Sequence, residues 1–178
     1  MAISLIVATS KSGGIGLNNK LLFDCSTDMR RFRELSENNF VIMGRNTYES
    51  LKSPLKNRIN VIVSRQGNDY NVDPHLLNKY DIILTDSLER VINHYNSGFQ
   101  EKDLCIIGGE SIYKQALPHV EKVYLTKFYH EKEYDTKFPL EYLDEHFEII
   151  HNEEYEVDGL RFDFIDYARK TKEENKYE

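Results

Sequence analysis

A glycine followed by an arginine and a threonine stands where an apolar segment ends and a helix is expected to begin. The apolar segment covers residues 41–43, and Gly44, Arg45, Asn46 and Thr47 follow it directly. Backbone N–H groups and the helix dipole attract anions at a helix N-terminus, and a guanidinium adds a permanent charge and a planar donor fork. We therefore expect a phosphate site here. An ordinary strand, turn and helix with a surface arginine would have the same pattern.

A second segment repeats this design. Residues 104–107 form an apolar run, Gly108 and Gly109 follow it, and Glu110 and Ser111 open the next expected helix. Two glycines let a ligand approach the backbone closely, and the helix N-terminus again favours phosphate. Tight packing alone would also require glycine here. Because the charge of Glu110 is unfavourable near a phosphate, we expect its side chain to point to solvent.

One aspartate is the candidate for binding a polar heterocycle. Asp28 lies in the first turn of an expected helix whose apolar stripe contains Met29, Phe32 and Leu35. A carboxylate beside such a stripe can face an apolar cleft. The alternative, which is the commoner role of aspartate at this place, is that Asp28 caps the helix or complements its dipole.

Length and composition suit a single globular domain. Of the 178 residues, 40% are hydrophobic and 30% are charged, which is typical of globular proteins. We expect one domain over residues 1–169 and a charged, frayed tail over residues 170–178. No apolar run approaches the length of a membrane span, and the first residues lack the pattern of a secretory signal. The expected location is therefore the cytoplasm, with no membrane partner.

Charge and cysteine content exclude other classes. The net charge is −7, and residues 131–178 hold 7 basic and 16 acidic residues, so we expect no nucleic-acid partner. The more basic front of the chain suits a binder of small anions, although Arg30 and Arg31 are expected simply to solvate a helix face. Cys25 and Cys105 lack metal-ligand spacing; Cys105 is expected to be a buried thiol and Cys25 to have a structural role. We expect a monomer without a metal ion.

Alternating strand and helix patterns must position these groups. Strands are predicted at 3–8, 41–44, 60–65, 81–84, 103–107 and 123–128, and helices at 26–35, after 45, at 87–95 and from 110. Residues 155–162 alternate around Asp-Gly and predict a hairpin. We expect residues 9–23 to be a loop that acts as a lid, and residues 66–80 to be a polar loop.

These elements predict an α/β fold with a mostly parallel sheet, helices on both faces and an antiparallel edge. Ligands bind beyond the carboxyl ends of the strands in such sheets. Arg45, Ser64 and Arg65 follow two of these ends, so they are expected to share one pocket.

The order and spacing of the segments resemble the dihydrofolate reductase family. The likeness rests on Ile3-Ser4-Leu5-Ile6, Ile15-Gly16, Asp28 with Phe32, Val41 to Ser50, Pro54-Leu55 with Arg58, Ile107-Gly108-Gly109 with Tyr113, Tyr124-Leu125-Thr126, and Asp135-Thr136 before Phe138. It implies an eight-stranded, mainly parallel sheet with an antiparallel C-terminal edge strand and about four flanking helices. It also implies reduction of 7,8-dihydrofolate by NADPH, with hydride transfer to C6 and water-mediated protonation of N5, in support of one-carbon and thymidylate metabolism.

The resemblance also implies roles for individual residues. Asp28, Thr126 and Phe23 belong to the reaction centre, where Asp28 accepts two hydrogen bonds from the pterin edge and Thr126 bonds Asp28. The implied substrate-binding residues are Ile6, Val7, Asp28, Met29, Phe32, Leu51, Leu55, Arg58, Ile107, Tyr113 and Thr126, with Arg58 on the glutamate-tail carboxylate. The implied cofactor-binding residues are Ala8, Ile15, Gly16, Asn19, Gly44, Arg45, Asn46, Thr47, Ser64, Arg65, Ile107, Gly108, Gly109, Ser111, Ile112, Tyr113 and Thr136. Arg45, Ser64 and Arg65 would hold the 2′-phosphate that distinguishes NADPH from NADH, and the Gly108–Gly109 peptide is commonly cis in the family.

Two alternatives stay open. A pyrimidine reductase of riboflavin synthesis shares this fold and NADPH site, but Asp28 and Arg58 favour a pteroylglutamate. The other alternative is a nucleotide-binding module that has lost turnover. It arises because Leu22 and Phe23 stand where the family usually has Pro-Trp, and Phe23 cannot donate an indole hydrogen bond to a water beside the pterin.

Overall fold

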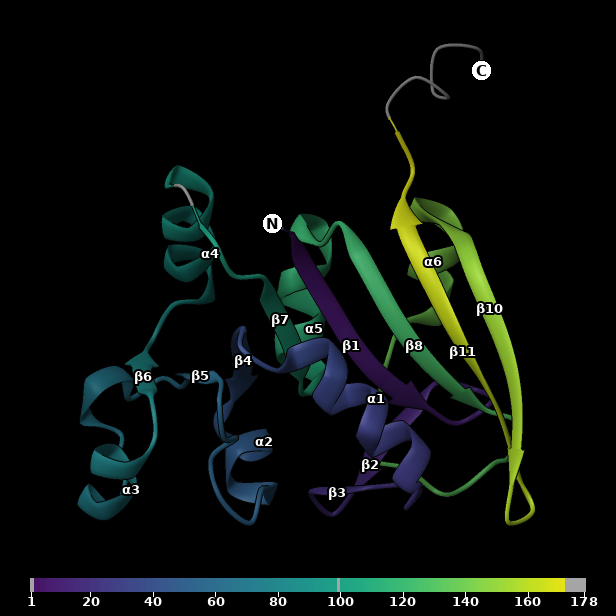
Figure 1. The fold of residues 1–178 in the computed structure, drawn as a ribbon, viewed down its shortest axis with the longest axis horizontal. Coiled ribbons are helices and arrows are strands. Elements are labelled where there is room, and N and C mark those ends of the chain that lie inside the picture. Colours follow the sequence, from purple (N-terminus) through teal and green to yellow (C-terminus); the bar gives the residue numbers. More distant parts are fainter. Residues whose placement is uncertain (1, 99, 172–178) are drawn as a thin grey trace.

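An eight-stranded sheet forms the centre of the molecule (Figure 1) in the computed structural model, which describes residues 2–98 and 100–171. Its strand order is β10-β11-β8-β1-β7-β4-β5-β6. The strands are β1 (Ile3–Thr9), β4 (Phe40–Gly44), β5 (Ile59–Val63), β6 (Ile82–Thr85), β7 (Leu104–Gly108), β8 (Lys122–Phe128), β10 (Phe147–Val157) and β11 (Leu160–Arg169). All pairs from β8 to β6 are parallel, whereas β11 runs antiparallel to β8 and to β10. The predicted mainly parallel sheet with an antiparallel C-terminal edge is confirmed.

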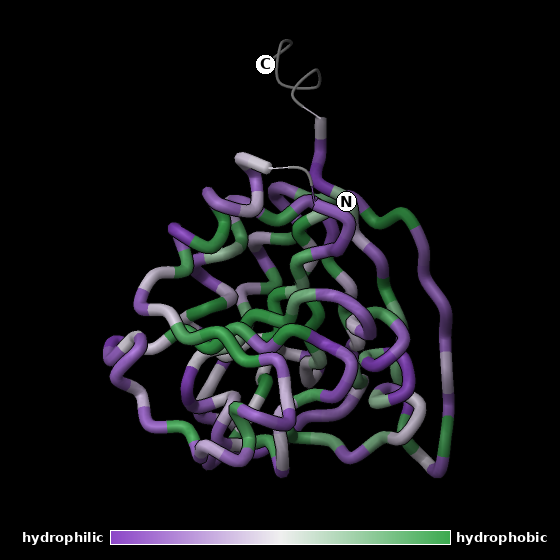
Figure 2. Tube along the Cα trace, turned by 60° about the vertical axis from the view of Figure 1, so that its left-hand side comes forward, coloured by the Kyte–Doolittle hydropathy of each residue, from purple (hydrophilic) through white to green (hydrophobic). Residues whose placement is uncertain are grey.

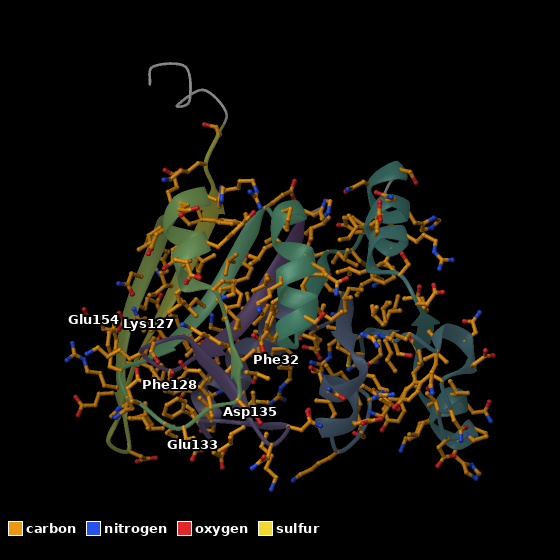
Figure 3. The ribbon with its side chains drawn as sticks, turned by 180° about the vertical axis from the view of Figure 1, so that it is seen from behind. Phe32, Lys127, Phe128, Glu133, Asp135 and Glu154 are labelled. Carbon is orange, nitrogen blue, oxygen red and sulfur yellow. The ribbon has the colours of Figure 1, made fainter. Side chains whose placement is uncertain are left out.

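Helices cover both faces of this sheet. The described residues form the α-helices α1 (Ser26–Ser36), α2 (Arg45–Ser50), α3 (Pro74–Lys79), α4 (Leu88–Ser97), α5 (Glu110–Ala116) and α6 (Leu140–His146), with short 3-10 turns at Gly67–Asp69 and Leu117–His119. Side chains of α1 and α2 pack on one face, and those of α4, α5 and α6 pack on the other. In Figure 1 the first pair lies in front, and Figure 3 shows α5 and α6 from the opposite side. None of the described helices combines the length and apolar character needed to cross a membrane.

Six α-helices in the described residues exceed the expected four because two short helices were missed. The expected polar loop over 66–80 contains α3, which begins at Pro74 after Asp73, and the carboxylate of Asp73 accepts a hydrogen bond from the backbone N–H of His75 at 2.9 Å. This is an N-cap followed by proline at the first helical position, which is a recognisable helix start. The helix α6 has no side-chain cap, so its sequence carries a weaker signal.

The expectation that residues 9–23 form a loop is wrong. The segment contains β2 (Gly14–Leu17) and β3 (Lys20–Leu21), which form a second, three-stranded sheet with β9 (Thr136–Lys137) in the order β3-β2-β9. Asn18 and Asn19 connect β2 to β3 with φ values of 50° and 60°, the left-handed backbone of a two-residue hairpin turn. The pairing of β2 with β9 joins segments about 120 residues apart, and local patterns carry no information about it.

The hydrophobic core lies between the sheet and its helices (Figure 2), where apolar chain runs through the centre and polar chain lies outside. Ile42 and Ile106 of the central strands are fully buried. Cys105 is a buried free thiol, as expected, and Cys25 is buried too. Burial raises the pKa of Cys105 to about 11.

The C-terminal hairpin is confirmed, with Val157 of β10 opposite Leu160 of β11. Asp158 and Gly159 form its turn with φ values of 51° and 80°. Of the expected charged tail over 170–178, residues 172–178 lie outside the described residues.

The prediction that two neighbouring arginines solvate a helix face is right for one and wrong for the other. Arg30 is exposed, whereas the side chain of Arg31 is 16% exposed and bonds the carboxylate of Asp166 on β11. The Arg31 guanidinium also lies 4.3 Å from the ring centroid of Phe164. This partner strand is distant in sequence, so the helix pattern alone could not reveal it.

Candidate active site

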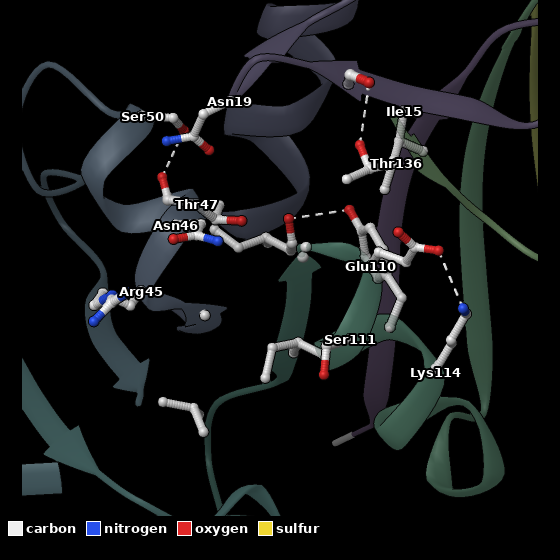
Figure 4. A pocket seen from close by; sticks show the side chains of 18 of the residues that line it. Ile15, Asn19, Arg45, Asn46, Thr47, Ser50, Glu110, Ser111, Lys114 and Thr136 are labelled. Carbon is white, nitrogen blue, oxygen red and sulfur yellow. Dashed lines mark hydrogen bonds and ion pairs between the residues drawn. The ribbon is translucent and has the colours of Figure 1, made fainter. Parts of the chain in front are cut away.

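A large cavity of about 1420 Å³ lies across the carboxyl ends of the parallel strands (Figure 4). The residues at these ends come from four consecutive strands of the sheet, in the order β1-β7-β4-β5. All of the expected cofactor-binding residues line it, namely Ala8, Ile15, Gly16, Asn19, Gly44, Arg45, Asn46, Thr47, Ser64, Arg65, Ile107, Gly108, Gly109, Ser111, Ile112, Tyr113 and Thr136. The expectation that Arg45, Ser64 and Arg65 share one pocket is confirmed as geometry.

The arginine side of this cavity suits an anion. Arg45 begins α2 directly after β4, and its guanidinium lies 3.7 Å from the carboxylate of Glu49, which also accepts a hydrogen bond from Tyr70. Both members of the ion pair are about half exposed, so the pair contributes little and can exchange for a phosphate. Ser64 and the exposed Arg65 follow β5 at the same edge. Together these groups provide a permanent positive charge and a hydroxyl donor.

The two glycines allow the close contacts expected of them. The Gly108–Gly109 peptide is cis, and Gly108 has a φ of 115°. A Cβ atom at Gly108 would lie 3.1 Å from the ring and hydroxyl of Tyr113, and one at Gly109 would lie 3.3 Å from the hydroxyl of Thr47. A side chain at either position would therefore crowd Tyr113 or Thr47, and both glycines also line the cavity. Tight packing and close ligand approach both require glycine here.

Tyr113 joins the cavity to the sheet. Its hydroxyl lies 2.7 Å from the backbone carbonyl of Ile6 and 3.0 Å from that of Ile107, so its one proton is shared between carbonyls of two adjacent strands, β1 and β7. Burial, and then the nearby charge of Asp28, raise the pKa of Tyr113 well above its usual value. Tyr113 therefore stays neutral and holds β1 and β7 in place beside the glycines.

Asp28 is held by a partner on the central sheet. It lies in the first turn of α1, and its Oδ1 accepts a hydrogen bond from Thr126 Oγ1 of β8 at 2.6 Å. Burial raises the pKa of Asp28, whereas the Thr126 hydrogen bond and the charge of Arg31 act in the opposite direction. No side chain caps α1 at its N-cap residue, Cys25. The hydrogen bond to Thr126 thus orients the carboxyl group against the sheet rather than toward the helix end.

Apolar side chains gather on the face of the sheet that α1, the helix of Asp28, covers. Phe32, Leu51, Leu55 and Ile107 are partly buried and pack on the cluster that contains Ile6. They come from three segments, namely α1, the connection between α2 and β5, and β7, and the surface that they form is the expected wall for a flat ring. Val7 lies at the base of the large cavity, while Met29 is 45% exposed.

Arg58 is fixed by two hydrogen bonds at the far end of this wall. Its Nη1 donates to Ser36 Oγ of α1 at 3.0 Å, and its Nε donates to the carbonyl of Lys56 at 2.9 Å. Burial lowers the pKa of Arg58. The guanidinium also lies 5.9 Å from the ring centroid of Phe32, so it adjoins the apolar wall.

Phe23 lies apart from the cavity lining. Its ring stacks on Phe128 with centroids 4.3 Å apart, and the side chain is 7% exposed. The ammonium group of Lys132 lies 4.8 Å from the centroid of the Phe23 ring. The structure therefore puts Phe23 in a buried, mainly aromatic cluster that also contains Cys25.

Several cavity residues were not predicted from the sequence. They are Asn18, Lys20, Leu21, Ser50, Val63, Gln66, Asp86, Glu110, Lys114, Gln115 and Asp135. The expectation that Glu110 points to solvent holds only in part, because Glu110 lines the cavity and lies 3.1 Å from Lys114 while 31% of its side chain is exposed. The spacing of four residues, which puts Glu110 and Lys114 on the same face of the helix, is a signal that could have revealed this pair. Lys114 offsets the negative charge that Glu110 places near the expected phosphate.

A second unpredicted residue holds the wall in place. Asn60 is fully buried, and its side chain exchanges hydrogen bonds with the backbone N–H and C=O of Leu55, both at 3.0 Å. It also donates to the carbonyl of Arg58.

Among the described residues, no three His, Cys, Asp or Glu side chains gather closely enough to hold a metal ion.

A parallel sheet whose strand ends open on an anion-attracting cavity, with a carboxyl group set in an apolar wall alongside, is the arrangement of an α/β enzyme that uses a nucleotide cofactor. Comparison with known proteins identifies the family. The family model for dihydrofolate reductase matches residues 2–169. The chain belongs to the dihydrofolate reductase family, whose reaction is the NADPH-dependent reduction of dihydrofolate.

Individual relatives agree with this assignment. The chain is 34% identical over 178 residues to the dihydrofolate reductase of Haemophilus influenzae, covering 100% of this chain and 94% of that one. It is 34% identical over 145 residues to the enzyme of Staphylococcus haemolyticus, covering 82% and 81%. A solved structure of dihydrofolate reductase from Enterococcus faecalis, complexed with NADP(H) and RAB-propyl, has a TM-score of 0.83 and 25% identity, covering 96% of this chain and 97% of that one.

Proposed function

We propose that this chain reduces 7,8-dihydrofolate to 5,6,7,8-tetrahydrofolate with NADPH, supplying one-carbon and thymidylate metabolism, and that the residues of the cavity and apolar wall carry out the steps. The observation that carries the residue assignment is the hydrogen bond between Asp28 and Thr126 beside the apolar wall. A carboxylate held in this way can accept two hydrogen bonds from the amidine-like edge of a pterin. Accepting both raises the basicity of the ring, which favours its protonation.

NADPH, when bound in the cavity, supplies the hydride. Arg45, Arg65 and Ser64 would hold its 2′-phosphate, because they bring positive charge and a hydroxyl to one edge of the cavity. Thr47, Gly108, Gly109 and Ser111 would hold the pyrophosphate, where two helices begin and a Cβ would be crowded. Ile15 and Gly16 of β2 would lie against the nicotinamide. The size of the cavity suits an extended dinucleotide.

The wall residues would bind and orient the substrate. Phe32, Leu51, Leu55 and Ile107 would sandwich the pterin and benzoyl rings, and Arg58 would pair with the carboxylate of the glutamate tail. Ile6, Val7, Met29 and Tyr113 would complete the surface. The carboxyl group of Asp28 would lie at the far edge of the ring from N5, so the proton would reach N5 through water. Phe23 would shape the lid without donating a hydrogen bond to that water.

A pyrimidine reductase of riboflavin synthesis is the alternative within this fold. Asp28 and Arg58 favour the pteroylglutamate, because one accepts from an amidine-like edge and the other pairs with a carboxylate. The test is an absorbance assay at 340 nm with purified protein, NADPH and dihydrofolate. We expect a fall in absorbance that needs both compounds. Oxidation of NADPH with a ribosylamino-pyrimidine, and none with dihydrofolate, would contradict the proposal.

We further propose that residues 1–169 act as one domain and that the protein is a cytoplasmic monomer. The family model covers nearly all of this range. The exposed large apolar side chains of the described residues are spread over five elements, namely Leu21 of β3, Met29 of α1, Leu77 of α3, Ile83 of β6, and Ile149 with Ile150 of β10. Two buried free thiols suit a reducing compartment. Light scattering after size exclusion should give a mass near 21.0 kDa, and twice that mass would contradict the monomer.

A further inference from the structure

Arg31 lies one helical turn after Asp28, yet it pairs with a different carboxylate. Residues three apart on a helix are neighbours, and aspartate and arginine at this spacing normally attract each other. In this chain the Arg31 guanidinium bonds Asp166 of β11 instead. The Asp28 carboxyl group bonds Thr126 of β8.

Three side chains hold Arg31 away from Asp28. Asp166 accepts a hydrogen bond from Nη2, the ring of Phe164 lies 4.3 Å from the guanidinium carbon, and the ring of Tyr124 lies 5.8 Å from it. The arginine side chain is 16% exposed and that of Asp166 is 21% exposed. A guanidinium that is stacked on an aromatic ring and bonded to a carboxylate at its edge has one preferred position.

An arginine released from this position would compete with the substrate. Its planar fork can donate two parallel hydrogen bonds to one carboxylate, which is the same pattern that an amidine-like pterin edge offers. The oxygens of Asp28 would then be occupied before substrate arrives. Arg30 does not compete for Asp28 in this way, because it is exposed on another side of the helix.

We propose that Asp166 is a positioning residue that sequesters Arg31 and thereby keeps the Asp28 carboxylate open for the donor edge of the substrate. This inference rests on the proposed role of Asp28 in substrate binding. Asp166 itself acts through Arg31, and it lies on the outer part of the sheet, two strands away from β1.

The other charged and titratable groups near this arginine do not offer it an equal partner. The charge of Arg31 also acts on Glu153 and Tyr155 of β10, but Glu153 already bonds His151 at 2.7 Å and the Tyr155 hydroxyl at 2.6 Å. Tyr124 of β8 faces Arg31 with its ring. Near Asp28 the groups are Thr126 of β8, Tyr113 of α5 and Arg31 itself. Loss of the Asp166 charge therefore leaves Asp28 as the carboxylate one turn away on the same helix.

Steady-state kinetics of four variants test the proposal. We expect Asp166→Ala to raise KM for dihydrofolate about tenfold, because the released Arg31 would pair with Asp28 and compete with the substrate. Arg31→Gln should keep KM within about twofold of wild type, and Asp166→Ala with Arg31→Gln should return to that level. The matched control is Asp166→Ala with Arg30→Gln, which removes one positive charge from the exposed neighbour and should stay impaired. A double variant as impaired as Asp166→Ala would overturn the proposal, because the pair would then have a structural role alone.

A second measurement does not depend on turnover. NMR titration of the carboxyl carbon of Asp28, assigned with Asp28→Asn, reports its pKa in the protein without ligand. We expect Asp166→Ala to lower this pKa by about one pH unit and the double variant with Arg31→Gln to restore it. An unchanged pKa in Asp166→Ala would overturn the sequestration of Arg31. A lowered pKa with unchanged KM would instead overturn the proposed role of Asp28 in binding substrate.

Discussion

The carboxyl group of Asp28 is costly to the fold at neutral pH. Burial raises its pKa above the ordinary value of 3.8, so the folded state holds this proton more tightly than the unfolded chain does. Stability is therefore lost as pH rises from the unfolded pKa through the folded one. The penalty is fully present above both values.

Asp28→Asn should accordingly make the protein more stable than wild type at pH 8, because it removes the buried charge and keeps an oxygen that can accept from Thr126. The advantage should shrink as pH falls through the raised pKa of the folded state towards 3.8, and below 3.8 Asp28 becomes protonated in both states. Urea unfolding of both proteins at pH 8, 6 and 5 measures the difference. An advantage that is the same at all three pH values would contradict the buried-charge explanation.

Arg45 and Arg65 are the residues expected to distinguish the two nicotinamide cofactors. Replacing both with alanine removes two positive charges from the cavity edge, so we expect kcat/KM for NADPH to fall by about 100-fold while that for NADH changes little. The ratio of the two values is the measurement, and Arg30→Ala with Lys79→Ala, which removes two positive charges from exposed helix positions, is the control. An unchanged ratio would place the 2′-phosphate elsewhere.

At the scale of elements, the segment that carries Leu55 and Arg58 depends on one buried amide. Asn60 bonds the backbone of Leu55 in both directions and reaches the carbonyl of Asp81 at 3.2 Å, so it joins this segment to the start of β5 and β6. Asn60→Ala leaves these backbone groups unpaired. It should lower the free energy of unfolding by about 3 kcal/mol and raise KM for dihydrofolate more than KM for NADPH.

Chemical denaturation and separate KM measurements test this prediction. Asn78→Ala on the exposed face of α3 is the matched control, and it should change stability by less than about 0.5 kcal/mol. If Asn60→Ala were as stable as the control, the amide would have no part in holding the wall.

The elements also show what local sequence can and cannot predict. Continuous apolar runs predicted β1, β4 and β7, because strands buried on both faces need apolar side chains at every position. The pairing of β2 with β9 and the contact of Arg31 with Asp166 were missed because each joins residues more than a hundred positions apart. The start of α3 at Asp73-Pro74 was a local signal that the polar composition of its surroundings concealed.

At the scale of the molecule, the sheet brings the site together from most of the chain. Asp28 and Thr126 are 98 residues apart, and their hydrogen bond forms because α1 packs across the strands next to β8. The resemblance to the family implied that these two residues interact, whereas no local pattern in the sequence predicts that they are close. For Glu110, the charge alone predicted a side chain in solvent, whereas its place at the start of α5 puts the partly exposed side chain at the cavity.

The same assembly predicts that cofactor and fold stabilise each other. A ligand that binds across β1, β4, β5 and β7 binds the folded state alone, so NADPH at about 100 times its Kd should add about 2.7 kcal/mol to the free energy of unfolding. Thermal or urea unfolding with and without NADPH measures this effect. Equal stabilisation of wild type and the Arg45→Ala, Arg65→Ala variant at the same NADPH concentration would contradict binding at this cavity edge.

Turnover by Asp28→Asn, measured together with its affinity for NADPH, is the most direct test of the site. Because Asn cannot accept both hydrogen bonds as a carboxylate does, we expect turnover at saturating NADPH and dihydrofolate to fall by roughly 100-fold or more. The Kd for NADPH, from fluorescence titration, should stay within about twofold of wild type, since the cavity lining is unchanged. Turnover equal to that of wild type would contradict the assignment of Asp28 to the reaction centre.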